Sequence, residues 1–543
     1  MSVVTLLRAN SKADPTKLVL MAALSGVASA GVLAFVNSAA SQVEAGKSTT
    51  SLFFMFGAAV FVFVIAQRYV LMTSVREVEN IIHSIRVRLF EQAIVSDLPE
   101  LERVGRSAVF SAISKETQTI AQSVNVLVMG ARAAILLVFS SIYLAVLSLP
   151  ALAIGAAFIV VALIVMFRKN RQIHVGFVKS SAQEASLFGV LDAMLTGFKE
   201  TRMNSGRAKE LLEDFCSRSA AAVHTRVEAR AHLADAVTLS QALIFILIGM
   251  LVFIVPALFP SSAPSVVKTA TAVLFMVGPL TSLVNAVPLY NMANAAAASI
   301  EAIGTGLSRD ETATAPKRKR FSGFSRITVE GLRFRHTDSK GQETFDVGPI
   351  DFEVKAGETV FLTGGNGSGK TTFIQLLIGL RQPMSGRILV DGRPVDAASL
   401  QSYRDLYAVV FSDCHLFRRL YGLGDPDPSF VDRWLELLEI GEKTEIVDGS
   451  FSTIDLSMGQ RKRIALLVAL LENRPIVVLD EWAADQDPQF RRKFYRELLV
   501  ELKRLGKTVI AITHDDRYFD AADRRIHMNY GKLESVDGND RDA

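Results

Sequence analysis

Residues 359–372 read TVFLTGGNGSGKTT, and this stretch decides the fold of the C-terminal part of the chain. A short apolar strand at 359–363 leads through a glycine-rich loop into a helical run at 373–380. Glycines at this spacing let backbone N–H groups turn inward around phosphates, and the N-terminus of the following helix adds positive potential. The stretch therefore predicts a phosphate-binding loop at the edge of an α/β sheet.

The loop predicts a nucleotide site whose positions have different tasks. Lys370 is expected to reach the β and γ phosphates of ATP, and the Thr371 hydroxyl is expected to bind Mg²⁺. The dinucleotide-binding fingerprint is excluded, because it requires a third glycine where Lys370 stands. The expected nucleotide-binding residues of the loop are Gly364, Gly365, Asn366, Gly367, Ser368, Gly369, Lys370, Thr371 and Thr372.

A second apolar run, PIVVLDE at 475–481, ends in two carboxylates. Ligands collect at the carboxyl edge of a parallel sheet, so both side chains are expected to face the nucleotide. Asp480 is the expected Mg²⁺ ligand, and Glu481 is the candidate base for the attacking water. The alternative is an acidic pair that caps a helix. Two motifs in this order favour the nucleotide site.

The first 300 residues have a different composition. Over the whole chain, half of the residues are hydrophobic, 21% are charged, and mean hydropathy is +0.30. Long uncharged stretches are concentrated in the first 300 residues. About 20 apolar residues are needed to cross a bilayer, whereas apolar helices of soluble cores are shorter. The uncharged stretches predict six transmembrane helices, near 18–36, 50–72, 121–147, 151–168, 237–259 and 269–291.

Basic residues predict the orientation of these helices. The connections 73–116 and 168–235 are rich in Lys and Arg, whereas the remaining connections hold only Lys47 and Lys268. The positive-inside rule places the two long connections in the cytoplasm. They read as helical extensions interrupted at 97–106 and 197–206. Cys216 and Cys414 then lie on the reducing side, and no disulfide framework or zinc site is expected.

Three further motifs resemble those of one family. Residues 456–460, LSMGQ, resemble the signature motif of ABC transporter ATPases. His514 resembles their switch histidine, and Asp487 resembles the aspartate after their second acidic motif. Together with the predicted membrane helices, the chain resembles an ABC exporter half-transporter.

The resemblance implies a fold and a division of the chain. A membrane all-α six-helix transmembrane domain of ABC exporter type is expected over 1–305, with long cytoplasmic extensions. A linker follows at 306–324, and its basic run at 317–320 is expected at the anionic lipid surface. An α/β P-loop ABC nucleotide-binding domain is expected over 325–543. The two breaks at 97–106 and 197–206 match the places where coupling helices of exporters dock.

The resemblance also implies a mechanism that needs two copies of the chain. ATP lies between the phosphate loop of one subunit and the signature motif of the other, so a homodimer is expected. Ser457, Gly459 and Gln460 then complete the partner's site, and Asp487 borders it. His514 is expected to contact the γ phosphate, and the catalytic set is Glu481, His514 and Lys370.

The chain departs from the family pattern at three places. Ser412 stands where a Mg²⁺-binding glutamine is usual, and Ser412, or Asp413 through water, is expected to replace it. Ser412 therefore joins Thr371 and Asp480 as an expected metal ligand. His336 stands near the usual adenine-stacking aromatic residue. The sequence WAADQDP at 482–488 replaces the usual residues after the acidic strand.

These departures resemble one subfamily. Residues 482–488, the phrase VFSD at 410–413 and GPID at 348–351 resemble cyclic-peptide and siderophore exporters. That group includes the pyoverdine and syringomycin exporters and the microcin J25 efflux pump. The expected function is ATP-driven export of a peptide-like natural product across the bacterial inner membrane, with a cytoplasmic ATPase domain.

Partners and alternatives follow from this interpretation. Besides cargo and membrane lipid, periplasmic or outer-membrane export partners are expected, and a net charge of +4 gives no argument for nucleic acid. The alternatives are a lipid or multidrug exporter, or a nucleotide-binding membrane regulator with little hydrolysis. For the cargo, Thr281, Asn285 and Met292 share a helix face, and Arg132 is the single charge between 117 and 167. Helix-to-helix contacts, and for Arg132 a position at the membrane interface, are the competing explanations.

Overall fold

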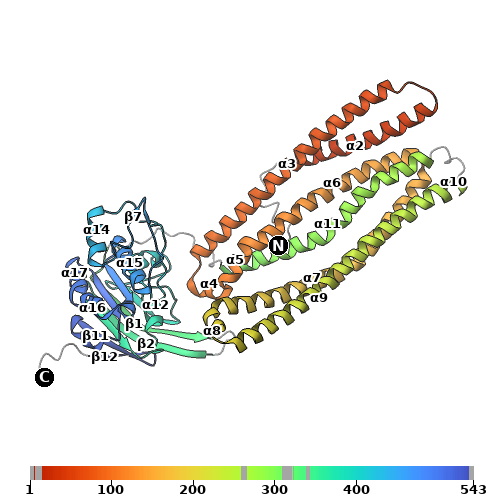
Figure 1. Ribbon diagram of the computed structural model, residues 1–543. Coiled ribbons are helices and arrows are strands. Elements are labelled where there is room, and N and C mark those ends of the chain that lie inside the picture. The colour runs from red at the N-terminus through yellow and green to blue at the C-terminus, as the bar shows by residue number, and fades with distance from the viewer. Residues whose placement is uncertain are drawn as a thin grey trace. The chain divides into compact units, whose positions relative to one another are not determined.

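The computed structural model describes residues 5, 15–258, 266–307, 321, 323–337 and 343–536. Two compact units result: Met1–Ser96 with Glu100–Ser308, and Asp97–Pro99 with Arg309–Ala543 (Figure 1). Most of the predicted linker, including the basic run at 317–320, lies outside the described residues.

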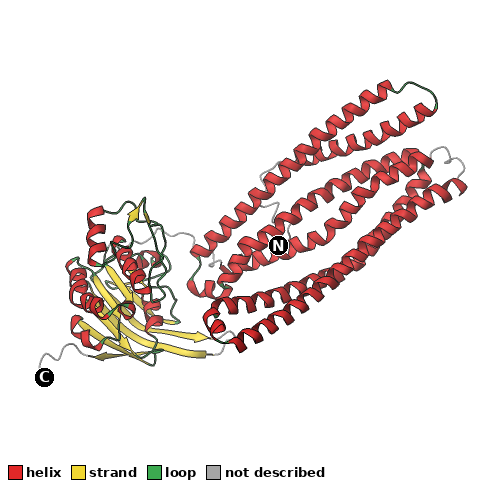
Figure 2. Ribbon diagram, viewed as in Figure 1, coloured by secondary structure: helices red, strands yellow, loops and turns green. Residues whose placement is uncertain are grey.

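The first unit consists of long helices, shown in Figure 2. They pack as pairs, with α2 against α3, α6 against α11, and α7 against α9 (Figure 1). Long apolar runs explain much of their length, and α11 continues through Pro279 and Pro288. Their bounds are α2 Pro15–Glu44, α3 Thr50–Val95, α6 Thr117–Leu147, α7 Leu149–Thr196, α9 Ser205–Gly249 and α11 Val266–Leu307.

Five helical stretches of this unit are long and apolar enough to cross a membrane. They contain the described parts of five predicted spans. The sixth predicted span, 151–168, lies inside α7, where the described side chains form a shorter apolar stretch, Leu149–Phe158. The helices therefore agree with a multi-pass membrane protein.

Short helices form at both predicted breaks in the cytoplasmic extensions. Helix α4, Leu98–Val104, follows α3 after Ser96, where the backbone is extended. Helix α8, Phe198–Met203, separates α7 from α9. The Asn204 side chain accepts a hydrogen bond from the Arg207 amide at 3.1 Å and so caps the start of α9.

The second unit is built on two main sheets. The four-stranded antiparallel sheet has the order β2 (Glu343–Lys355), β1 (Arg326–Thr337), β4 (Ser385–Val390), β5 (Arg393–Pro394). The six-stranded sheet has the order β12 (Lys532–Val536), β11 (Arg524–Asn529), β3 (Thr359–Gly364), β10 (Thr508–Ile512), β9 (Ile476–Asp480), β6 (Tyr407–Val410). Strands β11 to β6 are parallel, and β12 is antiparallel. A small hairpin joins β7 (Ile446–Val447) to β8 (Ser450–Phe451).

The parallel strands are buried on both faces: helices such as α15 cover one face, and α12 with the antiparallel sheet covers the other. Every residue of β3, β9 and β10 is buried, which explains their continuous apolar sequences. The helices of this unit are α12 (Lys370–Leu377), α13 (Leu400–Arg404), α14 (Pro428–Leu437), α15 (Met458–Leu471), α16 (Pro488–Lys493) and α17 (Leu499–Arg504). Helix α12 begins at Lys370 and ends at Leu377, so it starts and stops three residues before the predicted run.

The strand register brings the motifs to one edge. Asp480 at the end of β9 pairs with Ile512 at the end of β10, and Leu362 of β3 pairs with the same residue. The phosphate loop, the acidic pair and His514 thus follow the carboxyl ends of three adjacent strands. This edge is where ligands bind in open α/β sheets.

Candidate active site

The phosphate loop has the backbone that its glycines predict. Gly364, Gly367 and Gly369 have φ of 143°, 75° and 102°, values that other residues rarely adopt. A Cβ on Gly364 would collide with the carbonyl oxygen of Met528 and approach Ser368 Oγ. The loop conformation therefore requires these glycines.

Lys370 and the threonines after it surround the loop mouth. The Lys370 side chain is buried, and its Nζ donates to the carbonyl oxygens of Gly364 at 3.0 Å and Gly365 at 2.8 Å. Burial lowers the pKa of Lys370, whereas the carboxylates of Glu481 and Asp480 raise it. Thr371 is exposed at the start of α12. The ammonium group is thus held at the loop and faces two carboxylates.

The donor set fits Mg²⁺. Asp480 is 1% exposed, and both its carboxylate oxygens are buried without a well-formed hydrogen bond among the described residues. Burial raises the pKa of the Asp480 carboxyl, as does Glu481, whereas the hydroxyl and amide of Ser412 lower it. Ser412 therefore lies beside Asp480. Unsatisfied carboxylate oxygens next to hydroxyls are the hard ligands that Mg²⁺ prefers.

Glu481 and His514 lie together at the same edge. His514 Nε2 is 3.4 Å from Glu481 Oε1, and both side chains are partly exposed. Glu481 has a left-handed backbone with φ 49°, which is uncommon for a residue with a side chain. His336 Nε2 lies 3.0 Å from Thr372 Oγ1, so His336 also borders the loop. The chain brings the phosphate loop and five further predicted residues together here: His336, Ser412, Asp480, Glu481 and His514.

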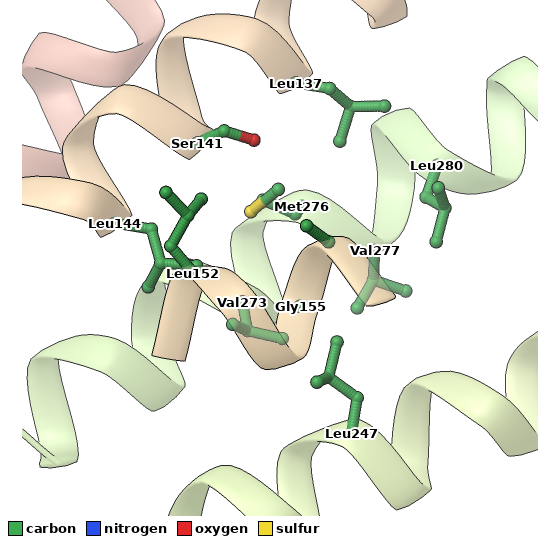
Figure 3. Close-up of a pocket in the computed structure, with 11 residues that line it drawn as sticks. Leu137, Ser141, Leu144, Leu152, Gly155, Leu247, Val273, Met276, Val277 and Leu280 are labelled. Carbon is green, nitrogen blue, oxygen red and sulfur yellow. The ribbon is translucent and has the colours of Figure 1, made fainter. Parts of the chain in front are cut away.

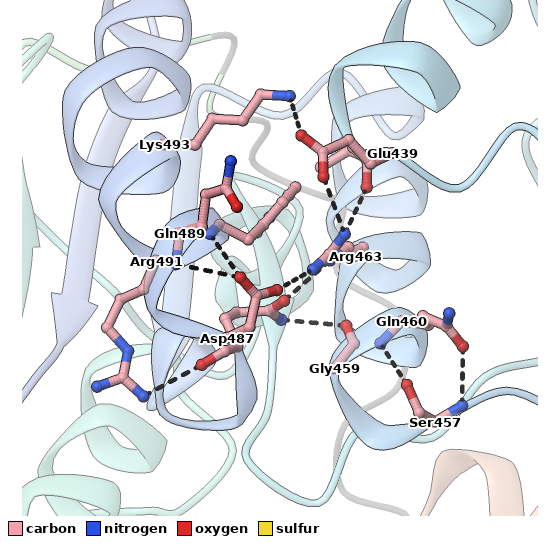
Figure 4. Close-up of polar contacts among 12 residues, drawn as sticks. Glu439, Ser457, Gly459, Gln460, Arg463, Asp487, Gln489, Arg491 and Lys493 are labelled. Carbon is pink, nitrogen blue, oxygen red and sulfur yellow. Dashed lines mark hydrogen bonds and ion pairs between the residues drawn. The ribbon is translucent and has the colours of Figure 1, made fainter.

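The remaining predicted residues form a second cluster, which we call the signature group: Ser457, Gly459, Gln460 and Asp487. Ser457 Oγ accepts from the Gln460 amide at 3.4 Å, and Gln460 Oε1 accepts from the Ser457 amide at 3.1 Å (Figure 4). This capping box begins α15. Among the described residues, no hydrogen bond or ion pair connects the signature group to the phosphate loop.

Asp487 caps the helix after the acidic strand. Its Oδ1 accepts from the amides of Gln489 at 3.1 Å and Phe490 at 2.9 Å (Figure 4). Arg463 Nη2 donates to its Oδ2 at 3.0 Å. The Phe490 amide foremost, with Arg463, lowers the pKa of the Asp487 carboxyl. Its carboxylate is therefore ionised and fixed beside the signature helix.

Sequence reasoning missed several residues that link these two clusters. Lys462 Nζ donates to the carbonyl oxygen of Glu481 at 2.7 Å, and Trp482 Nε1 donates to the carbonyl oxygen of Lys462 at 2.7 Å. Gln486 Nε2 donates to the carbonyl oxygen of Gly459 at 3.0 Å. The unusual sequence at 482–488 was the available signal, but its partners on α15 were not visible in it.

The membrane unit contains a cavity of about 230 Å³ (Figure 3). It is lined from α6, α7, α9 and α11, and the Ser141 hydroxyl is its polar contribution (Figure 3). Its residues are Leu137, Ser141, Leu144, Leu152, Gly155, Ala156, Leu247, Val273, Met276, Val277 and Leu280. The cavity does not include Thr281, Asn285 or Met292. Arg132, the other candidate for the cargo, has its guanidinium 5.7 Å from the Phe63 ring centre.

Comparisons with known proteins agree with this architecture. The ABC transporter family model matches residues 347–484. The ATP-binding protein SyrD of Pseudomonas syringae pv. syringae is 31% identical over 537 residues, which cover 94% of this chain and 92% of SyrD. An ATP-dependent lipid A-core flippase of Ralstonia nicotianae is 34% identical over 37% of this chain and 37% of its own length.

A solved structure has the same fold over nearly the full length. A bacterial Atm1-family ABC exporter with ATP bound superposes with a TM-score of 0.80 at 18% identity, covering 95% of this chain and 93% of that chain. The expected fold class, apolar helices followed by an α/β ATPase domain, is thereby confirmed. The same family is indicated by three findings: the nucleotide-binding edge of the sheet, the signature helix and the near full-length similarity to SyrD. This chain belongs to the ABC transporter family, as an exporter-type half-transporter that binds ATP with Mg²⁺ and couples its hydrolysis to transport.

Proposed function

We propose that two copies of this chain form a homodimer that exports a peptide-like natural product, of cyclic-peptide, siderophore or microcin type, across the bacterial inner membrane. The observation that supports the dimer is that, among the described residues, no hydrogen bond or ion pair joins the phosphate loop to the signature group of the same chain. Each cluster is half of a nucleotide site, and a second copy supplies the missing half to both. The N-terminus of α15 then meets the partner's phosphates, where backbone N–H groups favour anions.

The residues of one composite site have separate roles in binding ATP and in hydrolysing it. The loop amides and Lys370 bind and orient the phosphates. Thr371, Asp480 and Ser412 would hold Mg²⁺, which would neutralise charge on the phosphate oxygens. Glu481 accepts the proton of the attacking water, and His514, 3.4 Å from Glu481, orients that water against the γ phosphate. His336 packs beside the adenine.

Two observations support the peptide-like cargo. The sequence at 482–488 resembles the cyclic-peptide and siderophore exporters, and SyrD matches over 94% of the chain. By contrast, the lipid A-core flippase and the β-(1→2)glucan export protein NdvA of Agrobacterium vitis match over 37% and 38% of the chain. Export of lipid or of other small molecules is the second candidate. The apolar cavity in Figure 3 is the observation in its favour.

Transport into inside-out vesicles tests the proposal. Vesicles from cells that produce the chain are given ATP with labelled cyclic peptides, or with labelled lipid analogues, and uptake is measured. The matched control is Lys370→Ala, which removes the phosphate-binding ammonium. ATP-dependent peptide uptake by the parent that Lys370→Ala lacks supports the proposal. ATP-dependent movement of lipid without any uptake of peptide contradicts the proposed cargo class.

A further inference from the structure

Lys462 is a buried lysine on the signature helix α15. Its side chain is 2% exposed, although it belongs to the basic run at 461–463 that sequence alone places on a helix surface. Its ammonium group donates to the carbonyl oxygen of Glu481 at 2.7 Å and pairs with Asp485 Oδ2 at 2.6 Å. A buried ammonium is stable only when such partners compensate its lost hydration. Its position is therefore fixed by the segment that follows β9.

The contact matters because of the residue that it holds. Glu481 has φ 49° and ψ 39°, a strained conformation that the surrounding structure must maintain. Its carbonyl oxygen is held by a charged donor, and charge-assisted hydrogen bonds are the stronger kind. The backbone at Glu481 sets the direction of its carboxylate toward His514. Lys462 thus acts on Glu481 through the backbone, without touching the expected position of the nucleotide.

Two further contacts join α15 to the same segment. Gln486 bonds the segment 482–486 to α15. Its Nε2 donates to the carbonyl oxygen of Gly459, and its Oε1 accepts from Arg463 Nε at 2.9 Å. A Cβ on Gly459 would lie 2.6 Å from the carbonyl oxygen of Asp485, so the two backbones are in close contact. The first turns of α15 and the segment 482–486 are therefore bonded at several points, and one cannot shift alone.

We infer that Lys462 is a positioning residue that ties Glu481 to the helix carrying the signature motif. The base for one ATP is then held by the same helix that contacts the second ATP in the dimer. Displacement of α15 moves the Glu481 carbonyl through the ammonium of Lys462. This inference rests on the proposed role of Glu481 as the base.

Lys462→Met tests the inference, because methionine keeps an unbranched apolar chain and removes the donor. The loop and Lys370 are unchanged, so the affinity for ATP and its KM stay at parental values. Small misplacements of a reacting group are costly, and we expect kcat to fall by at least about 10-fold. The matched control is Lys507→Met. Lys507 is also buried and donates to Asn473 Oδ1 at 2.8 Å and to the carbonyl oxygen of Arg474 at 2.9 Å, away from Glu481.

A double variant separates positioning from general stability. In the Glu481→Gln background the base is absent, so Lys462→Met lowers the residual rate no further, whereas Lys507→Met behaves as it does in the parent. If Lys462→Met does not fold, Asp485→Ala removes one acceptor from a side chain that is 43% exposed. It too lowers kcat at unchanged ATP affinity.

The outcomes that overturn the inference are specific. A parental kcat in Lys462→Met, or in Asp485→Ala when the first variant does not fold, contradicts it. So does a further loss of rate when Lys462→Met is added to Glu481→Gln. If Glu481→Gln itself hydrolyses ATP like the parent, the proposed base is wrong and the inference about Lys462 fails with it. Failure of the base is thus distinguished from failure of Lys462 as a positioning residue.

Discussion

Ser412 is the residue where this chain departs from the Mg²⁺-binding glutamine of its family. The serine lies beside the buried carboxylate of Asp480, and its hydroxyl and amide lower the pKa of that group. We propose that this hydroxyl takes the place of the glutamine as a ligand of Mg²⁺.

Replacing Ser412 with alanine tests this role. We expect Ser412→Ala to raise the Mg²⁺ concentration for half-maximal ATPase activity by about 10-fold, because loss of a supporting ligand weakens metal sites by such factors. The measurement is a Mg²⁺ titration of ATP hydrolysis at saturating ATP. The exposed Ser429 in the first turn of α14, outside the predicted metal ligands, supplies the matched control, Ser429→Ala. An unchanged Mg²⁺ requirement in Ser412→Ala would show that the serine has no part in the site.

The sequence predicts some residues of the site but not others. Gly364, Lys370 and Asp480 follow from spacing, because each belongs to a contiguous motif next to a strand end. Lys462 does not, since a lysine in a basic run normally faces solvent. Its burial depends on Asp485 and on the Glu481 carbonyl, which approach α15 only after the sheet has formed. Contacts between motifs that are distant in sequence are the part that composition and spacing leave open.

At the scale of elements, helix α15 combines a structural and a functional task in Ser457. The hydroxyl caps the helix through the Gln460 amide, and the same helix start is expected to face the partner's ATP. These tasks respond differently to substitution. Alanine removes the cap, whereas aspartate keeps it and adds a negative charge.

A pair of variants at Ser457 separates the two tasks. Ser457→Ala is expected to lower the free energy of unfolding by about 1 kcal/mol, the usual value of an N-cap. Ser457→Asp retains stability, because aspartate is a good N-cap and suits the helix dipole. Yet Ser457→Asp loses ATP hydrolysis, since its carboxylate repels the γ phosphate. Denaturant unfolding and ATPase assays measure both, and full activity in Ser457→Asp would refute the contact with ATP.

The sequence predicts some elements of the membrane unit, such as the helix breaks, but not its cavity. The two breaks in the cytoplasmic extensions were visible in the sequence because Pro99 and Gly197 interrupt helical runs. Short helices, Leu98–Val104 and Phe198–Met203, occupy them. The cavity in Figure 3 was not predicted, because it is formed by apolar side chains from four helices rather than by the polar face of α11.

At the scale of the whole molecule, the distribution of Lys and Arg predicts which ends of the helices face the cytoplasm. Cys216 is an exposed thiol on α9, within the basic connection, and Cys414 is buried in the ATPase unit. A membrane-impermeant maleimide should therefore label the chain in inside-out vesicles and leave it unlabelled in intact spheroplasts. Cys216→Ser is the control that should abolish labelling. Labelling of Cys216 from outside intact spheroplasts would reverse the predicted orientation.

We propose that Glu481 activates the attacking water in this ATP-driven transporter. The most direct test measures ATP turnover and retained nucleotide in lipid nanodiscs, for the parent and for Glu481→Gln. The parent should hydrolyse ATP, and the variant should lose roughly 100-fold or more of the rate while still retaining ATP, because a general base contributes on that scale. Hydrolysis by Glu481→Gln at the parental rate would contradict the account.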